Sequence, residues 1–132
     1  MATPAFDPDD PYLARLRGIA LAFPGAGEKL VVGHPAFFTR KVFAYFGMSY
    51  KAEGQWVRPP HAVCVLLPED ERLSLLEDPR VFIPGYIGPF GWIGLALDAA
   101  TDWRETEELV ELSYRETAAA RLVLELDVRR EA

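Results

Sequence analysis

Apolar residues recur at helical spacing near the start of the chain, in "DDPYLARLRGIALAFPG". Their spacing of three and four residues places side chains such as Leu13 and Leu16 on one face of a helix. Asp10 is a good N-cap residue, and Pro11 fits the first helical position because its missing N–H needs no partner there. The pattern predicts a helix that begins at Pro11 and ends at the Pro-Gly pair that closes this stretch.

The next part of the chain is rich in β-branched and aromatic residues. "KLVVG", "PAFFTRKVFAYF" and "AVCVLLP" are separated by glycine, proline and polar stretches, which is typical of strands. The middle segment predicts a tight hairpin about residues 39–41, or one long strand, because the turn lacks Gly or Asn. The link "GMSYKAEGQWVRPPH" is long for a compact domain, so we expect part of it to be strand or a mobile loop.

The second half returns to helical signals. "PEDERLSLLEDP" carries acids in a first turn, which favours a short helix, and "VFIP" and "GWIGLALD" then read as strands. Asp102 and the glutamate three residues on resemble a capping box, which opens a long helix over "WRETEELVELSYRETAAARL". The tail "RLVLELDVRREA" alternates like a strand, but its Ala, Leu, Arg and Glu content favours helix.

The order α-β-β-β-α-β-β-α predicts a two-layer α+β domain, an antiparallel sheet covered on one side by helices. In "GWIGLAL", Ile93, Leu95 and Leu97 fall on one face and suit the helices, whereas Trp92 and Gly94 fall on the other. That second face is apolar and is predicted to stay open to solvent, a ligand or a second subunit.

The composition fits one soluble domain over residues 1–132, with residues 1–8 as a flexible N-terminal arm. The chain is 50% hydrophobic and 26% charged, and no apolar run is long enough to cross a bilayer. Its one cysteine, Cys64, excludes an intrachain disulfide and a multi-thiolate metal site, which fits a reducing compartment and a cytoplasmic location.

The charge is uneven along the chain, although the net charge is −6. Residues 28–61 hold five Lys or Arg against two Glu, whereas residues 62–132 hold seven Arg against fifteen acids. The basic part, interleaved with Tyr50 and Trp56, suggests contacts to phosphates and stacking on bases. The candidate DNA-binding residues are Lys29, Arg40, Lys41, Lys51 and Arg58.

Enzyme chemistry finds little support in the sequence. His61 and Cys64 are close in sequence, but side chains three apart in a strand point to opposite faces, and Cys64 lies in an apolar run. His34, His61 and scattered acids form no metal-ligand cluster, so we expect neither a metal nor a cofactor.

The stretch "PGYIGPFGW" has a GxxGxxG spacing at residues 85–91, but it leads into a strand instead of a helix N-terminus. We therefore interpret it as an irregular connection whose aromatic rings pack against the sheet edge, with a binding loop as the alternative. The candidate ligand or partner surface consists of Tyr86, Phe90, Trp92 and Gly94.

Several stretches together resemble the MmcQ/YjbR family of small bacterial proteins. They are "ALAFPGAGE", "GHPAFFTRKVFA", "LPEDERLSLLEDPRVFIP", "GYIGPFGWIGLALD" and "EELVELSYRETAAARL", and they span nearly the whole chain. The resemblance implies a YjbR/CyaY-like α+β domain, similar in element order to the secretion-chaperone-like fold, and brings no catalytic residues with it. Members often carry "RGK" where this chain reads "TRKV" at residues 39–42, and a Lys near the position of Arg121.

The sequence thus favours a non-enzymatic binding domain of the MmcQ/YjbR type. The family label implies DNA as the partner, bound weakly through the basic hairpin. The alternative is a protein-interaction, self-association or small-ligand module that uses the open sheet face and the loop at residues 85–92; a membrane is not an expected partner.

Overall fold

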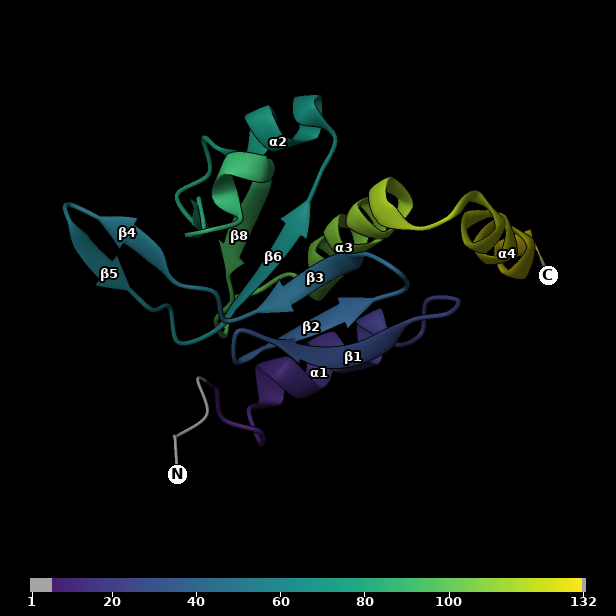
Figure 1. Ribbon diagram of the computed structural model, residues 1–132, viewed down its shortest axis with the longest axis horizontal. Coiled ribbons are helices and arrows are strands. Elements are labelled where there is room, and N and C mark those ends of the chain that lie inside the picture. The colour runs from purple at the N-terminus through teal and green to yellow at the C-terminus, as the bar shows by residue number, and fades with distance from the viewer. Residues whose placement is uncertain (1–5, 132) are drawn as a thin grey trace.

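A six-stranded antiparallel sheet organises the chain in the computed structural model, which describes residues 6–131 (Figure 1). The strands lie in the order β1-β2-β3-β6-β8-β7, and β4 pairs with β5 in a separate hairpin. Their bounds are β1 Gly27–Val31, β2 His34–Phe38, β3 Val42–Phe46, β4 Tyr50–Ala52, β5 Gln55–Val57, β6 Ala62–Leu66, β7 Val81–Phe82 and β8 Trp92–Ala96.

Helices cover one face of this sheet, so the predicted two-layer α+β architecture is confirmed. The helices are α1 Pro11–Ala20, α2 Glu69–Leu75, α3 Trp103–Thr117 and α4 Ala120–Glu131, with a 3₁₀ turn, η1, at Gly88–Phe90. Asp10 caps α1 as predicted, because its side chain accepts the N–H groups of Tyr12 and Leu13. None of the described helices is long and apolar enough to cross a membrane.

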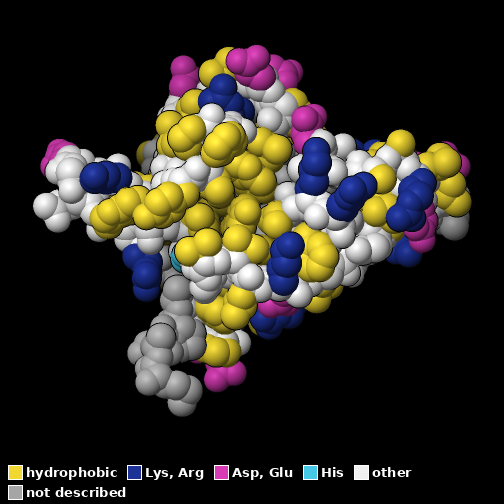
Figure 2. Space-filling view, in the orientation of Figure 1, with side chains coloured by type: hydrophobic (Ala, Val, Ile, Leu, Met, Phe, Trp, Pro, Cys, Tyr) yellow, Lys and Arg dark blue, Asp and Glu magenta, His cyan; other side chains and the backbone are white. Residues whose placement is uncertain are grey.

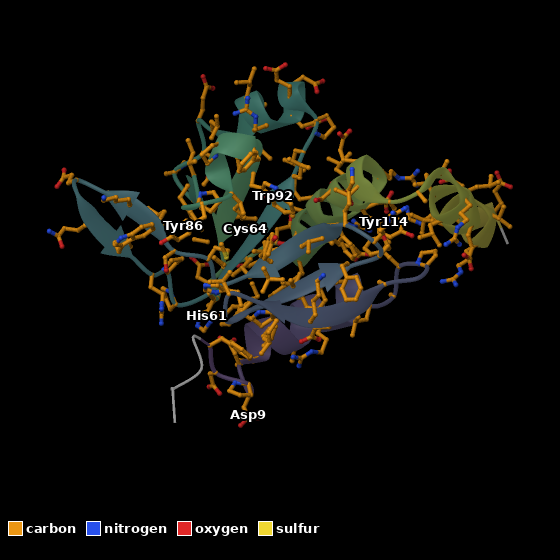
Figure 3. The ribbon with its side chains drawn as sticks, viewed as in Figure 1. Asp9, His61, Cys64, Tyr86, Trp92 and Tyr114 are labelled. Atoms are coloured by element: carbon orange, nitrogen blue, oxygen red, sulfur yellow. The ribbon has the colours of Figure 1, made fainter. Side chains whose placement is uncertain are left out.

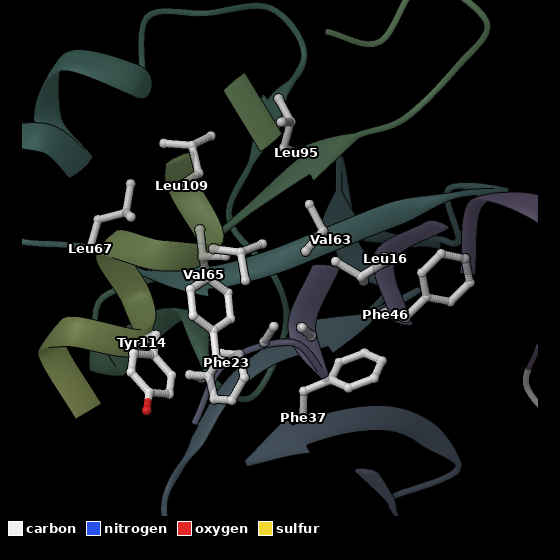
Figure 4. Packing of buried hydrophobic residues seen from close by; sticks show 14 of the residues in the cluster. Leu16, Phe23, Phe37, Phe46, Val63, Val65, Leu67, Leu95, Leu109 and Tyr114 are labelled. Carbon is white, nitrogen blue, oxygen red and sulfur yellow. The ribbon is translucent and has the colours of Figure 1, made fainter. Parts of the chain in front are cut away.

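The main core lies between the sheet and the long helices (Figure 4). Strand alternation turns the buried Val63, Val65 and Leu95 toward α1 and α3. Tyr114 of α3 stacks on Phe23 at 4.8 Å between ring centroids. Its hydroxyl donates a 2.7 Å hydrogen bond to the carbonyl of Pro24, so this large ring leaves no buried polar atom unpaired.

The "SYR" residues of α3 serve the fold. The Ser113 hydroxyl donates to the carbonyl of Phe43 in β3 and accepts the N–H of Leu66 in β6, so it joins neighbouring strands. Arg115 pairs with Glu111 and, at 2.7 Å, with Asp127 of α4, so it holds the last two helices together.

Three features differ from the sequence prediction or extend it. The long link forms the β4–β5 hairpin, which projects from the end of β3 (Figure 1). The predicted single helix over residues 103–122 is wrong, because Ala118 adopts an extended ψ of 152° and a new helix begins at Ala120. Of the predicted N-terminal arm, residues 1–5 lie outside the described residues, and Phe6 packs half-buried against the main core.

Candidate ligand groove on the open sheet face

The face of the sheet without helices carries a second, smaller apolar cluster. Ala36, Tyr45, Met48, Cys64 and Trp92 are buried there. The ring of Trp92 meets that of Tyr45 edge-on, with centroids 5.1 Å apart. Cys64 is fully buried, as its apolar sequence context predicted, and this burial raises the pKa of its thiol.

The β4–β5 hairpin is fixed at its base to β7 and to the segment that follows it. Tyr50 of β4 stacks on Phe82 at 4.7 Å. Trp56 of β5 stacks on Tyr86 at 5.6 Å. The N–H of Gly85 donates to the carbonyl of Ser49 at 2.8 Å, and a Cβ on Gly85 would lie 2.6 Å from the Trp56 ring. A side chain at Gly85 would displace the Trp56 ring, so glycine suits this close approach of the loop to the hairpin.

A groove of about 760 Å³ opens between this hairpin, the β1–β2 turn and the sheet. Figure 2 shows hydrophobic side chains gathered over the middle of this face and continuing toward β4–β5. Tyr86 stands between the hairpin and the sheet, whereas Cys64 and Trp92 lie over the sheet itself (Figure 3). The groove is lined by Val31, Val32, His34, Tyr45, Met48, Ser49, Trp56, Arg58, Tyr86 and Ile87.

Two of the groove's apolar residues adopt a strained backbone. Val32 and Tyr86 have φ values of 50° and 63°, in the left-handed region. This region costs an L-residue roughly 1–2 kcal/mol, and it is a genuine outlier for a β-branched side chain such as Val32. Both side chains are also exposed, Val32 at 86% and Tyr86 at 77%, so burial does not compensate for the strain.

His34 supplies a neutral polar group at the side of the groove. Burial lowers the pKa of His34, the nearby Arg58 charge acts in the same direction, and the Phe46 backbone carbonyl opposes them. Its Nδ1 atom is sealed from solvent and makes no hydrogen bond of good geometry within the described residues. Because Nδ1 is inaccessible, Nε2 is the ring nitrogen that a ligand in the groove could meet.

Arg58 is the only charged residue that lines the groove in the described part of the chain. It precedes Pro59, which restricts its backbone to extended conformations. Three residues after Arg58, His61 is anchored to the N-terminus of α1, because its Nδ1 lies 2.7 Å from Asp10 Oδ2. Arg58 is exposed and forms no ion pair with any carboxylate within residues 6–131.

The predicted ligand surface is thus distributed over three environments. Tyr86 lines the groove. Trp92 is buried beside Tyr45, and Gly94 lies under the ring of Phe82, where a Cβ would come within 2.2 Å. Phe90 is exposed in η1 and does not line the groove, so the expected packing of both Phe90 and Tyr86 against the sheet edge is wrong.

The predicted basic residues do not gather at one place. Arg40 and Lys41 form the β2–β3 turn, at the opposite end of these strands from the β4–β5 hairpin (Figure 1). Lys51 and Arg58 lie on or just after that hairpin, and Lys29 lies in the edge strand β1. None of the five forms an ion pair within the described residues.

Sequence reasoning missed most of the groove. His34 and Tyr45 read as ordinary strand residues, and Val32 as part of an apolar run. The one sequence signal for the groove was Val32 before Gly33. A two-residue hairpin turn with positive φ at both positions prefers Asn or Asp before Gly, so a valine there is unusual.

A second pocket of about 600 Å³ lies on the other side of Arg58, next to the Asp10–His61 pair. Tyr12 stacks on His61 with ring centroids 4.1 Å apart. The carboxylate of Asp10 also caps α1, so both partners have structural roles there. No group of three metal-ligating side chains occurs within the described residues.

A protein-family model described as YjbR matches residues 21–116. The chain belongs to the YjbR family. The match contains the sheet and all groove residues, whereas α1 and α4 lie outside it.

A solved structure of similar fold supports the architecture. The crystal structure of a protein from Pseudomonas syringae superimposes with a TM-score of 0.60 over 83% of this chain and 99% of its own. The two sequences are 15% identical, so the likeness concerns the fold alone. Among curated proteins, none matches this chain.

Proposed function

We propose that this YjbR protein is a binding module whose groove on the open sheet face takes a small organic ligand. The observation that carries the proposal is the pair of strained, exposed apolar residues, Val32 and Tyr86, which come from two separate segments and line one groove. A residue type that a positive-φ position does not favour is often kept for function. The groove volume also lies in the range of sites for small molecules, roughly 300–1,000 Å³.

The test replaces Val32 by a residue that suits its positive φ. Val32→Asn removes the apolar side chain but suits the left-handed turn, so the variant should be at least as stable as the parent. The matched control is Glu53→Asn, because Glu53 has the same φ of 50° in the equivalent two-residue turn of β4–β5 and does not line the groove.

A fragment library is screened by amide chemical-shift mapping on the parent and both variants. Hits should shift the groove amides together, from the β1–β2 turn, the β4–β5 hairpin and residues 85–87. Val32→Asn should weaken these hits, whereas Glu53→Asn should leave them unchanged. Hits that avoid these amides, or that bind both variants equally, would contradict the proposal. Shifts at the groove that grow with protein concentration alone would indicate self-association instead.

DNA binding is the second proposal, because none of the five basic residues forms an ion pair within the described residues. Two separated groups, Arg40 with Lys41 and Lys51 with Arg58, would each contact about two phosphates, which predicts a slope of log K against log salt of about −2 to −4. An anisotropy titration with a labelled duplex measures this slope. Charge reversal at Arg40 and Lys41 should flatten this slope. If no binding is detected at low salt, or if the charge reversal does not change the binding, the DNA-binding proposal is wrong.

A further inference from the structure

The charge around the groove differs from the charge of the whole protein. The chain carries a net charge of −6, but no carboxylate lines the groove in the described residues, and its one charged lining residue is Arg58. Lys51 adds positive charge nearby, with its Nζ 5.9 Å from the centre of the Trp56 ring. A small anion would therefore meet a local positive potential on an otherwise acidic surface.

Most residues that line the groove are apolar, so an anion that fits it should also carry an apolar group. Val32, Met48 and Ile87 supply aliphatic and thioether surface, and Tyr86 supplies an aromatic face. Besides Arg58, the polar side chains that line the groove are those of His34, Tyr45 and Ser49. Burial raises the pKa of Tyr45, so its hydroxyl stays protonated and can donate.

The single cationic residue that lines the groove, Arg58, favours a ligand with a single negative charge. Sites for phosphate dianions usually combine several Arg, Lys or backbone N–H donors, whereas one guanidinium matches one carboxylate through two parallel hydrogen bonds. His34 is held neutral by burial and adds no second positive charge.

We propose that the groove selects a free small carboxylic acid with an apolar, ring-sized body, whose carboxylate binds Arg58 and whose body lies against Val32, Ile87 and Tyr86. This inference rests on the proposed function and names the ligand class of the same site. Arg58 is the specificity-determining residue. The Asp10–His61 pair positions it, because it fixes the chain just beyond Pro59 and Pro60.

The experiment compares probes that share one ring system and differ in charge. 2-Naphthoate, 2-naphthamide, 2-naphthylmethylammonium and 2-naphthyl phosphate are titrated against the parent by calorimetry, with amide shifts to locate each. Hydrogen bonds to charged groups contribute about 1.5–3 kcal/mol, so the carboxylate should bind at least about tenfold more tightly than the amide. The ammonium probe should bind most weakly.

Two variants assign the preference. Arg58→Gln keeps a polar side chain without charge and should reduce the ratio of carboxylate to amide affinity to about one. Lys51→Gln removes a neighbouring cation that does not line the groove, and should change the ratio by no more than about threefold.

The results distinguish a wrong ligand class from a groove that binds no small ligand. Equal affinities for all four probes in the groove, or tightest binding of the ammonium or the phosphate, would overturn the carboxylate class while groove binding stands. A preference that survives Arg58→Gln would overturn the role of Arg58. If no probe shifts the groove amides of the parent, the ligand class is wrong and the groove function loses its support as well.

Discussion

The two faces of the six-stranded sheet are built by the same strands but end in different environments. On the face that the helices cover, Phe43, Phe23 and Tyr114 interlock, with Phe43 and Tyr114 rings edge to face at 5.3 Å. On the open face, the β4–β5 hairpin holds Trp56 and Tyr86 away from the sheet, so a groove remains beside the small cluster around Trp92. Side chains of similar chemistry thus stabilise the fold on one face and leave an open groove on the other.

The largest effect should come from truncating an aromatic ring on the covered face. Phe43 is fully buried, so Phe43→Ala should lower the free energy of unfolding by about 3–5 kcal/mol through lost contacts and a cavity. The matched change on the open face, Tyr86→Ala, removes an exposed ring and one stacking partner, and should cost less than about 1 kcal/mol. Urea denaturation measures both. Similar losses at the two positions would show that Tyr86 belongs to the core and would remove the contrast between the faces.

Much of this contrast is readable from the sequence. The alternation in β8 assigned Ile93 and Leu95 to the helices and Trp92 and Gly94 to the other face, and the apolar context of Cys64 predicted its burial. These predictions hold because a strand has a period of two, so one buried neighbour fixes the orientation of the rest.

The groove was not predictable in the same way. Its walls come from segments far apart in the sequence, and they meet only because Trp56 packs on Gly85 and Tyr86. The break between α3 and α4 also lacks a local signal, since Ala118 and Ala119 are good helix formers. There the burial of Leu122 in the main core accompanies the change of direction.

A second, smaller effect should follow from filling the space over Gly94. An added Cβ would lie 2.2 Å from the Phe82 ring, so Gly94→Ala must displace this ring and its stacking on Tyr50, at a cost of about 1–3 kcal/mol. Gly18 is the control, because it lies in α1 with no atom near its Cβ position, and Gly18→Ala should stabilise by roughly 0.5–1 kcal/mol.

The double variant Phe82→Ala with Gly94→Ala tests the cause of that loss. If the ring is responsible, Gly94→Ala should cost much less in the Phe82→Ala background, which a double-mutant cycle from thermal or urea unfolding detects. An unchanged cost in that background would show that the strand itself cannot accept the methyl group.

The smallest effect concerns pH and separates the two histidines. Burial lowers the pKa of His34 in the folded protein below its unfolded value near 6.5, so the unfolded chain binds the extra proton first. Stability should therefore be complete above about pH 7 and should decrease as the pH falls toward 5. The ion-paired carboxyls of Asp78, Glu111 and Asp127 have lowered pKa values, and their contributions to stability are lost only in more acidic solution.

Two variants assign this dependence on pH to one histidine. His34→Gln should reduce the change in unfolding free energy between pH 7 and 5. His61→Gln is the control, and it should leave the part of that change that comes from His34. A slope that His34→Gln does not reduce would mean that the ring beside the groove takes up a proton in the native state, and that the groove is more polar than its lining indicates.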